Sequence, residues 1–255
     1  MTKDLVAHFT DSHIGQRLVM DGEMDRSQMR YDPEPDEHGA HLRLILDDIA
    51  QKGITNVIFG GDIGSKQAVG GFFDLLKAYP FRTSGVLGNH DDYGDVARYW
   101  NVEASQVNRK LCYSRSDSFW KFVFLDTSDN ALGEEQLVWL RRELDGASQV
   151  ALFLHHPILA IDTPLERAGA ALRDRQELKT VLSGADCEVS VFCGHYHMID
   201  EAVEGNIRQF VSPAVSYQIV KQTDRLRVDK KTFGYRILEI SGTQIRTEAV
   251  LLTEA

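Results

Sequence analysis

The chain has 255 residues, of which 43% are hydrophobic and 26% are charged. This balance is typical of a globular domain and excludes a disordered chain or an integral membrane protein. The formal net charge of −10, from 38 acidic and 28 basic residues, argues against a nucleic-acid polymer as partner. We expect one compact domain over residues 1–255, because nothing in the sequence looks like a linker between separate units.

Cysteines and the first residues indicate the compartment. Cys112, Cys187 and Cys193 are odd in number and irregularly spaced, so no disulfide framework is expected. The N-terminus passes into an apolar run without a signal segment, and no apolar stretch is long enough to span a bilayer. We therefore predict a cytoplasmic protein with no membrane partner.

The first apolar run predicts a strand that ends in polar residues. Leu5 to Thr10 leads to Asp11, and His13 lies two residues further, on the same side of an extended backbone. The polar segment from Ile14 to Gly39 contains Asp32-Pro33-Glu34-Pro35-Asp36, which should break any regular element. We expect a long loop there, and interpret it either as a substrate-selecting lid or simply as a mobile segment.

A helix and a second strand follow. Apolar residues at helical spacing predict the helix from about Glu37 to Lys52, and Gly53 stops it. Val57 to Phe59 predicts a buried strand that ends at Gly60-Gly61, directly before Asp62.

A third strand end carries the most specific cluster in the sequence. A helix from about Lys66 to Tyr79 precedes a strand from Thr83 to Leu87, which ends at Gly88-Asn89-His90-Asp91. Amide, imidazole and carboxylate follow one another there, although a tight turn would use similar residues.

The second half of the chain has the same organisation. Leu111 to Ser114 and Phe119 to Thr127 predict antiparallel strands that open a second sheet, and an amphipathic helix spans Gly133 to Leu144. Val150 to Leu154 predicts a buried strand that ends at His155-His156-Pro157.

The last strand of this kind precedes a pair of histidines. After a polar connection, Ile158 to Arg175, a helix of about Asp174 to Leu182 and a strand from Glu188 to Cys193 lead to Gly194-His195-Tyr196-His197. Histidines at i and i+2 are a recurrent metal-binding arrangement. Four further segments predict antiparallel strands: Asn206 to Val211, Val215 to Val220, Gly234 to Ile240 and Gln244 to Leu251.

Five polar clusters thus fall at the carboxyl ends of successive predicted strands. That edge of an α/β sheet is where ligands bind. Each cluster alone also reads as an ordinary turn, but a coincidence at all five positions is improbable. Their imidazole, carboxylate and amide groups are donors for metal ions.

The five clusters resemble the motifs of the calcineurin-like binuclear metallophosphoesterases: Asp-x-His, Gly-Asp, Gly-Asn-His-Asp, His-x-Pro and Gly-His-x-His. The resemblance spans about Leu5 to His197. Gly234 to Ile240 also looks like the tail strand of the branch that contains cyclic-nucleotide and glycerophosphodiester phosphodiesterases. The fold that the resemblance implies is α/β, a four-layer αββα sandwich of two mixed β-sheets flanked by helices.

The resemblance also implies a two-metal site with assigned roles. One ion would be held by Asp11, His13 and His197, the other by Asn89, His155 and His195, with Asp62 bridging. These mixed nitrogen and oxygen ligands suit Mn, Fe or Zn, and a hydroxide bridging the two ions would attack the phosphorus.

Residues beside the ions receive roles by the same resemblance. His90 would contact the scissile ester, donating a hydrogen bond to phosphate or a proton to the leaving group, and Asp91 would orient it. His156 is a weaker candidate for contacting a ligand histidine, and Tyr196 is a candidate lining residue.

The sequence departs from the family in three places. Ser65 stands where purple acid phosphatases carry tyrosine, so no iron–tyrosinate colour is expected. Ile158 replaces the second proline of a common His-His-Pro-Pro sequence, and the loop from Ile14 to Gly39 is long. The last two changes lie where substrate would be selected.

The sequence therefore predicts a metal-dependent hydrolase of small phosphoesters. A phosphodiesterase acting on a cyclic nucleotide or a glycerophosphodiester is the leading hypothesis. A phosphomonoesterase or nucleotide pyrophosphatase with the same site is the alternative within the enzymes, and a metal-free interaction module is the alternative of another class.

Overall fold

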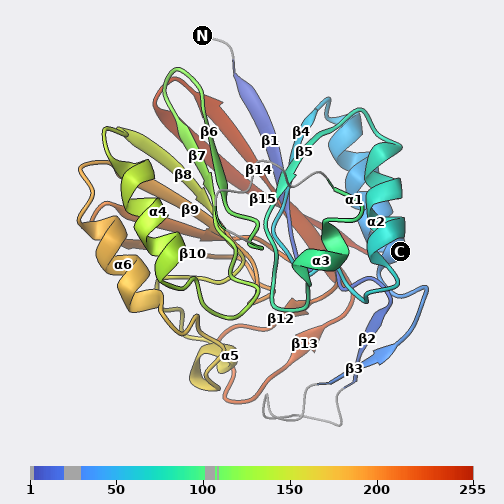
Figure 1. Ribbon diagram of the computed structural model, residues 1–255. Helices are drawn as coiled ribbons and strands as arrows, with labels where there is room; N and C mark the ends of the chain where they lie inside the picture. Colours follow the sequence, from blue (N-terminus) through green and yellow to red (C-terminus); the bar gives the residue numbers. More distant parts are fainter. Residues whose placement is uncertain (1–2, 20–29, 101–106, 108, 255) are drawn as a thin grey trace.

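Two mixed β-sheets pack face to face and are covered by helices on their outer faces in a computed structural model of the chain (Figure 1). The structure describes residues 3–19, 30–100, 107 and 109–254. The four layers are those of the predicted αββα sandwich.

The first sheet has the order β15-β14-β1-β4-β5. Its strands are β1 (Asp4–Phe9), β4 (Asn56–Phe59), β5 (Arg82–Gly85), β14 (Thr232–Ser241) and β15 (Gln244–Thr253). β1, β4 and β5 are parallel, so their carboxyl ends meet at one edge, and β14 and β15 extend the sheet in antiparallel fashion.

The second sheet has the order β10-β11-β9-β8-β7-β6. Its strands are β6 (Tyr113–Ser116), β7 (Lys121–Phe124), β8 (Gln149–Phe153), β9 (Glu188–Cys193), β10 (Asp200–Glu204) and β11 (Ile207–Val211). The four middle strands, β11, β9, β8 and β7, are parallel to one another. The edge strands β10 and β6 are antiparallel to their neighbours.

Helices cover the outer face of each sheet through apolar stripes. The longer ones are α1 (Gly39–Gln51) and α2 (Val69–Lys77) on the first sheet and α4 (Glu134–Leu144) and α6 (Arg175–Ser183) on the second. α1 shows the principle: Leu42, Ile45, Leu46 and Ile49 recur at helical spacing and are fully buried.

Aromatic side chains fill the space between the sheets. Phe124, Phe153, Phe192 and Phe210 stack along the second sheet, with ring centroids 5.1 to 5.3 Å apart. Buried aliphatic residues of the first sheet, such as Ile58, pack against them. Burial of this area is the main stabilising term, and it fixes the two sheets relative to one another.

The segment from Ile14 to Gly39 is more regular than predicted. β2 (Gln16–Val19) and β3 (Arg30–Pro33) pair in antiparallel register, so the prediction of a loop without regular structure was wrong at both ends. Pro33 lies at the last position of an edge strand, where its missing N–H costs no ladder bond. The part of the segment from 20 to 29 lies outside the described residues.

The C-terminal strands also differ from the prediction. β11 pairs with β9 in parallel, because β10 intervenes and brings the chain back at the edge of the sheet. The sequence did not predict β10, because three of its five residues are charged. Val215 to Val220 forms only the short β12 (Gln218–Ile219), which pairs with β13 (Val228–Asp229). The remaining elements are the short helices α3 (Tyr93–Val96) and α5 (Pro164–Arg167).

Two further predictions concern cysteines and membranes. All three cysteines are free and buried, as expected without a disulfide framework. Among the described residues, the helices all fall short of the length and apolar composition needed to cross a bilayer.

Candidate metal centre

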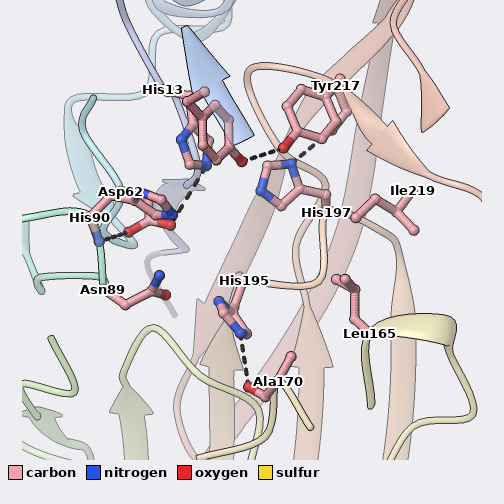
Figure 2. Close-up of a pocket in the computed structure, with 11 residues that line it drawn as sticks. His13, Asp62, Asn89, His90, Leu165, Ala170, His195, His197, Tyr217 and Ile219 are labelled. Atoms are coloured by element: carbon pink, nitrogen blue, oxygen red, sulfur yellow. Dashed lines mark hydrogen bonds and ion pairs between the residues drawn. The ribbon is translucent and has the colours of Figure 1, made fainter. Parts of the chain in front are cut away.

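Side chains from five strand ends meet where the two sheets come together, and Figure 2 shows those that line a cavity there. They surround a cavity of about 190 Å³. The residues that line it are His13, Tyr31, Asp62, Asn89, His90, Leu165, Ala170, His195, His197, Tyr217 and Ile219. Five of the seven predicted metal ligands are in this lining, and Asp11 and His155 lie buried behind it.

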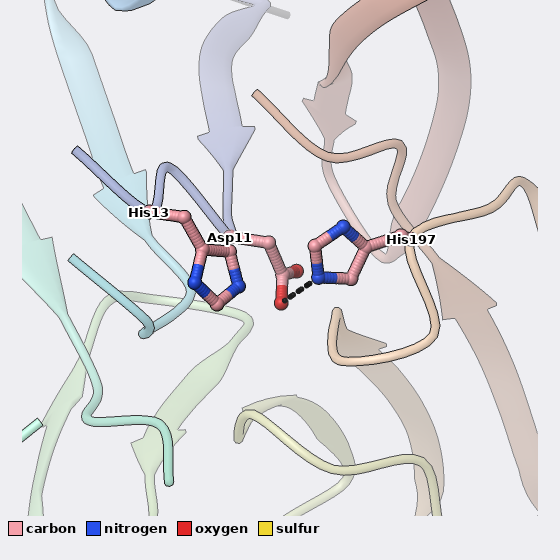
Figure 3. Close-up of side chains that lie close together, drawn as sticks. All are labelled: Asp11, His13 and His197. Atoms are coloured by element: carbon pink, nitrogen blue, oxygen red, sulfur yellow. Dashed lines mark ion pairs between the residues drawn. The ribbon is translucent and has the colours of Figure 1, made fainter. Parts of the chain in front are cut away.

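One group of ligand atoms joins the end of β1 to the turn after β9. Asp11, His13 and His197 each offer an atom within 4.8 Å of the others (Figure 3). The carboxylate oxygen Oδ1 of Asp11 lies 3.3 Å from Nε2 of His197. This is the set that the sequence predicted for the first ion.

A second group lies beside the first. Asp62, His155 and His195 also offer atoms within 4.8 Å of one another. Oδ2 of Asp62 is 3.2 Å from Nε2 of His155 and 3.6 Å from Nε2 of His13, so one oxygen faces ligands of both predicted ions. That position is the one a bridging carboxylate requires.

Each histidine among the predicted ligands has one ring nitrogen, here called the outer one, within hydrogen-bond distance of an oxygen acceptor. When one ring nitrogen of a histidine donates its N–H to an acceptor, the other nitrogen, here called the inner one, keeps a lone pair that can bind a metal. The pairs are His13 Nδ1 with Gln16 Oε1 at 3.0 Å, His155 Nδ1 with the Gly60 carbonyl at 2.8 Å, His197 Nδ1 with the Tyr217 carbonyl at 3.1 Å, and His195 Nε2 with the Ala170 carbonyl at 3.0 Å. All four rings are therefore fixed in orientation, as coordination of a metal by the other nitrogen would require.

Buried atoms without partners test whether the site fits metal ions. Within the described part of the chain, six buried side-chain nitrogen or oxygen atoms lack a hydrogen bond. Three of them belong to predicted ligands: Nε2 of His13, Nε2 of His155 and Oδ1 of Asn89. Leaving such atoms unsatisfied costs free energy, which coordination to a cation would offset. Their chemistry, imidazole nitrogen with carboxylate and amide oxygen, suits a transition metal.

The backbone at the site is unusual. Nine non-glycine residues of the described chain have positive φ, and five of them are predicted ligands. These are Asp11, His13, Asp62, His195 and His197, with φ between 42° and 66°. Left-handed conformations at non-glycine residues cluster at functional sites, where the surrounding structure compensates their cost.

Two glycines permit a close approach of backbone to the carboxylates. A Cβ at Gly88 would lie 2.2 Å from Oδ1 of Asp62, and one at Gly194 would lie 2.3 Å from Oδ2 of Asp11. Only glycine fits in either place. The glycines of these two motifs therefore make room for the carboxylates of two predicted ligands.

The charges in the cluster favour metal binding. Burial alone raises the pKa of Asp62, but positive charge on His155 and His90 outweighs it and holds this pKa well below its usual range. Burial lowers the pKa of His13 to about 3 and that of His195 well below normal. Burial opposes the charge on His155, but Asp62 and Asp11 raise its pKa to about 10. A cation bound here would therefore meet ionised carboxylates and would have to displace the proton of His155.

His90 and Asp91 occupy different surroundings. His90 is exposed at the mouth of the cavity, and its ring lies edge-on to that of His13 with centroids 5.0 Å apart. Its backbone N–H donates to Oδ1 of Asp62 at 2.8 Å. The Asp91 carboxylate accepts backbone N–H bonds from Asp62, Ile63 and Gly88, at 2.8 to 2.9 Å. Asp91 thus holds the backbone around Asp62, rather than taking the expected position against the His90 ring.

Of the two weaker candidates from the sequence, His156 lies where it was expected and Tyr196 does not. The His156 ring lies 4.2 Å from that of His195 and is fixed by the Thr127 hydroxyl at 2.8 Å, so it packs on a predicted ligand as expected. Tyr196 is buried and donates its hydroxyl to Glu166 at 2.5 Å, away from the residues that line the cavity.

Sequence reasoning missed two tyrosines of the cavity. Tyr31 stacks on His13 with ring centroids 4.8 Å apart, and its hydroxyl lies 2.5 Å from that of Tyr217. Tyr31 comes from the segment expected to be a loop, and Tyr217 from one expected to be a regular strand. No spacing pattern in either segment points to a site.

A model of the family described as calcineurin-like phosphoesterase matches residues 5–198. The chain belongs to this family. It is accordingly a hydrolytic phosphoesterase of a binuclear metal-dependent family, and the clusters of histidine and aspartate described above can hold metal ions.

Individual relatives are distant but cover most of the chain. A protein of Fibrobacter succinogenes named as a probable cyclic nucleotide phosphodiesterase is 25% identical, over 84% of this chain and 80% of its own length. A protein of Arcobacter nitrofigilis named as a probable glycerophosphodiester phosphodiesterase is 26% identical, over 69% and 67%. The crystal structure of a dimetal phosphatase from Danio rerio has the same fold, with a TM-score of 0.65, 15% identity and 99% coverage of both chains.

Proposed function

We propose that the protein hydrolyses small phosphodiesters with two divalent metal ions. The ligands proposed for the first ion are Asp11, His13 and His197, and those for the second are Asn89, His155 and His195, with Asp62 shared. The observation that carries this proposal is the convergence of these donors, with inner nitrogens facing the cluster and outer nitrogens fixed by acceptors. Mn, Fe or Zn suits the donor set.

The lining of the cavity supports a diester rather than a monoester. Among the lining residues of the described chain, none is lysine or arginine. A monoester carries up to two negative charges at neutral pH, whereas a diester carries one, so beyond the two ions themselves the lining supplies no cation that would favour the more highly charged monoester. The names of the relatives in Fibrobacter and Arcobacter point the same way.

The side chains divide the work of the reaction. Two bound divalent ions would supply Lewis acidity, which acidifies water and withdraws charge from the phosphoryl oxygens. Asp62 and the histidines would hold those ions. His90, exposed at the mouth, is the residue we assign to hydrogen bonding with phosphate and protonation of the leaving alkoxide.

Hydrolysis of monoesters is the second candidate. A rat protein named serine/threonine-protein phosphatase CPPED1 is 28% identical over 164 residues, which is 56% of this chain. A metal-free interaction module is disfavoured, because all seven predicted ligands are present and come together. The single domain over residues 1–255 and the cytoplasmic location stay predictions.

Parallel assays test the proposal. Metal-stripped protein is given Mn²⁺, Fe²⁺, Zn²⁺ or Mg²⁺, and the hydrolysis of bis(p-nitrophenyl) phosphate is compared with that of p-nitrophenyl phosphate. We expect metal-restored turnover that favours the diester. Faster turnover of the monoester would move the assignment to the phosphatases, and no turnover with any metal would refute an enzymatic role for these substrates.

The Asp62→Ala variant is the control for the site. It removes the shared carboxylate, so we expect loss of activity and of at least one ion per chain in metal analysis. A variant that keeps both ions would show that Asp62 does not bridge them.

A further inference from the structure

A second cavity of about 420 Å³ adjoins the metal centre. Its lining residues are Gly15, Gln16, Tyr31, Asp32, Pro33, Pro35, Ser65, Gln67 and Ala68. Tyr31 lines both cavities, so the two meet at its ring. Gln16, which lines the second cavity, also holds the outer nitrogen of the ligand His13. The second cavity therefore lies directly beside the reaction site.

The walls of this cavity are fixed by backbone hydrogen bonds. The Ser65 N–H donates to the Ile14 carbonyl at 2.9 Å, which joins the turn after Asp62 to the segment after His13. The Glu34 N–H donates to the Gly15 carbonyl at 3.1 Å, and the Gly15 N–H donates to the Glu37 carbonyl at 3.1 Å. Three segments far apart in sequence thus form one built cleft rather than a casual surface hollow.

Size argues that the substrate extends beyond the metal centre. The cavity at the metal centre, at about 190 Å³, is smaller than the ~300 Å³ at which ligand pockets usually begin. It holds a phosphate and small substituents, but not a large ester group as well. The adjoining cavity provides the remaining room.

The chemistry of the lining selects a flat, weakly polar group. Tyr31, Pro33, Pro35 and Ala68 offer apolar surface, while Gln16, Asp32, Ser65 and Gln67 supply hydrogen-bonding groups. None of the lining residues in the described chain is lysine or arginine, so a second phosphate finds no counter-ion. Aromatic rings bury large flat areas on such surfaces and stack on tyrosine.

We propose that this second cavity binds an aromatic or heteroaromatic ester group of the substrate, with Tyr31 at the boundary between that group and the phosphate. The inference rests on the proposed function and adds a subsite to it. The hairpin of β2 and β3 supplies Tyr31 and much of the wall, which gives this part of the chain a role in substrate selection (Figure 1).

Symmetric diesters test the subsite, whichever ester group leaves. Diphenyl phosphate and diethyl phosphate are compared as competitive inhibitors of bis(p-nitrophenyl) phosphate hydrolysis by the metal-loaded protein. We expect diphenyl phosphate to bind about tenfold more tightly, the scale of one aromatic contact. Equal inhibition constants alongside metal-restored diester turnover would overturn the subsite and leave the proposed function intact.

Filling the cavity provides the decisive comparison. Ala68→Leu should abolish the preference for diphenyl phosphate without changing the inhibition constant of diethyl phosphate. The matched control is Ala147→Leu, which places the same side chain in a separate cavity near Gly146 and Ala185 and should change neither constant. Gln67→Trp, at an exposed position on the rim, repeats the test should Ala68→Leu fold poorly.

The other outcomes are equally clear. If the preference survives Ala68→Leu and Gln67→Trp, the aromatic group binds elsewhere and the subsite is refuted. If no metal restores diester turnover, the proposed function fails and the subsite fails with it.

Discussion

Gly88→Ala perturbs the proposed metal centre without altering any ligand atom. The new Cβ would lie 2.2 Å from Oδ1 of Asp62, and contacts of this kind essentially never fall below 3.0 Å. The two atoms therefore have to separate by about 0.8 Å. Oδ1 also accepts a hydrogen bond from the backbone N–H of His90 at 2.8 Å, so a shift of the carboxylate disturbs that bond.

Displacement of a reacting group by about 1 Å costs on the order of 100-fold in rate. We expect Gly88→Ala to lower kcat/KM for bis(p-nitrophenyl) phosphate by about this factor, and to weaken metal binding in titrations. The φ angle of Gly88 is not positive, so alanine can adopt its backbone conformation. The new Cβ would also lie 2.6 Å from the backbone nitrogen of Asp62, so the backbone of this residue has to shift together with its carboxylate.

Gly71→Ala is the matched control for this substitution. Gly71 lies within α2, and a Cβ there meets nothing within 4 Å. Kinetics should not change, and the free energy of unfolding should rise by about 0.5–1 kcal/mol, since alanine is the better helix former. The reasoning would be refuted by a Gly88→Ala protein with wild-type kcat/KM and metal affinity.

Three further predictions concern residues around the ions. His90→Ala should lower turnover by about 10²–10⁴-fold with both ions still bound. If metal analysis shows that the variant has lost an ion, His90 is a ligand instead, which its proximity to His13 and Asp62 allows. Gln16→Ala frees the outer nitrogen of His13 and should weaken metal binding by about 10–100-fold, and an unchanged titration would contradict this orienting role. Asp91→Asn replaces one of two accepting oxygens with a donor, so the free energy of unfolding of metal-free protein should fall by about 1–3 kcal/mol. Urea denaturation measures this last effect, and an unchanged midpoint would count against it.

Much of the architecture follows from sequence patterns. The strands that precede Asp62 and His155 have continuous apolar cores, Val57 to Phe59 and Val150 to Leu154, as buried parallel strands usually do, and the run from Leu5 to Thr10 before Asp11 is apolar except for His8 and Thr10. The resemblance to the family then predicted that the residues at these strand ends form one site. Helices such as α1 carry a stripe of buried residues whose period alone identifies them.

The parts that were missed depend on tertiary contacts. Asp200–Glu204 is mostly charged and becomes strand β10 only because β11 offers a free edge. Val215 and Ser216 read as strand, yet their N–H groups donate to the carbonyls of Thr10 and Asp11, outside any ladder. Tyr31 reaches the cavity through the pairing of β2 with β3, which local sequence does not specify.

The proposed ligands come from both sheets of the sandwich: Asp11, His13, Asp62 and Asn89 follow strands of the first sheet, and His155, His195 and His197 follow strands of the second. An ion held jointly by Asp62 and His155 is therefore a crosslink between the sheets, and separating them means releasing it. A metal ion that binds only the folded state adds about 2.7 kcal/mol to the free energy of unfolding when the free metal concentration is 100 times the dissociation constant. The melting temperature of this protein should accordingly follow the supply of metal, and a substitution can be damaging in chelator yet silent when metal is plentiful.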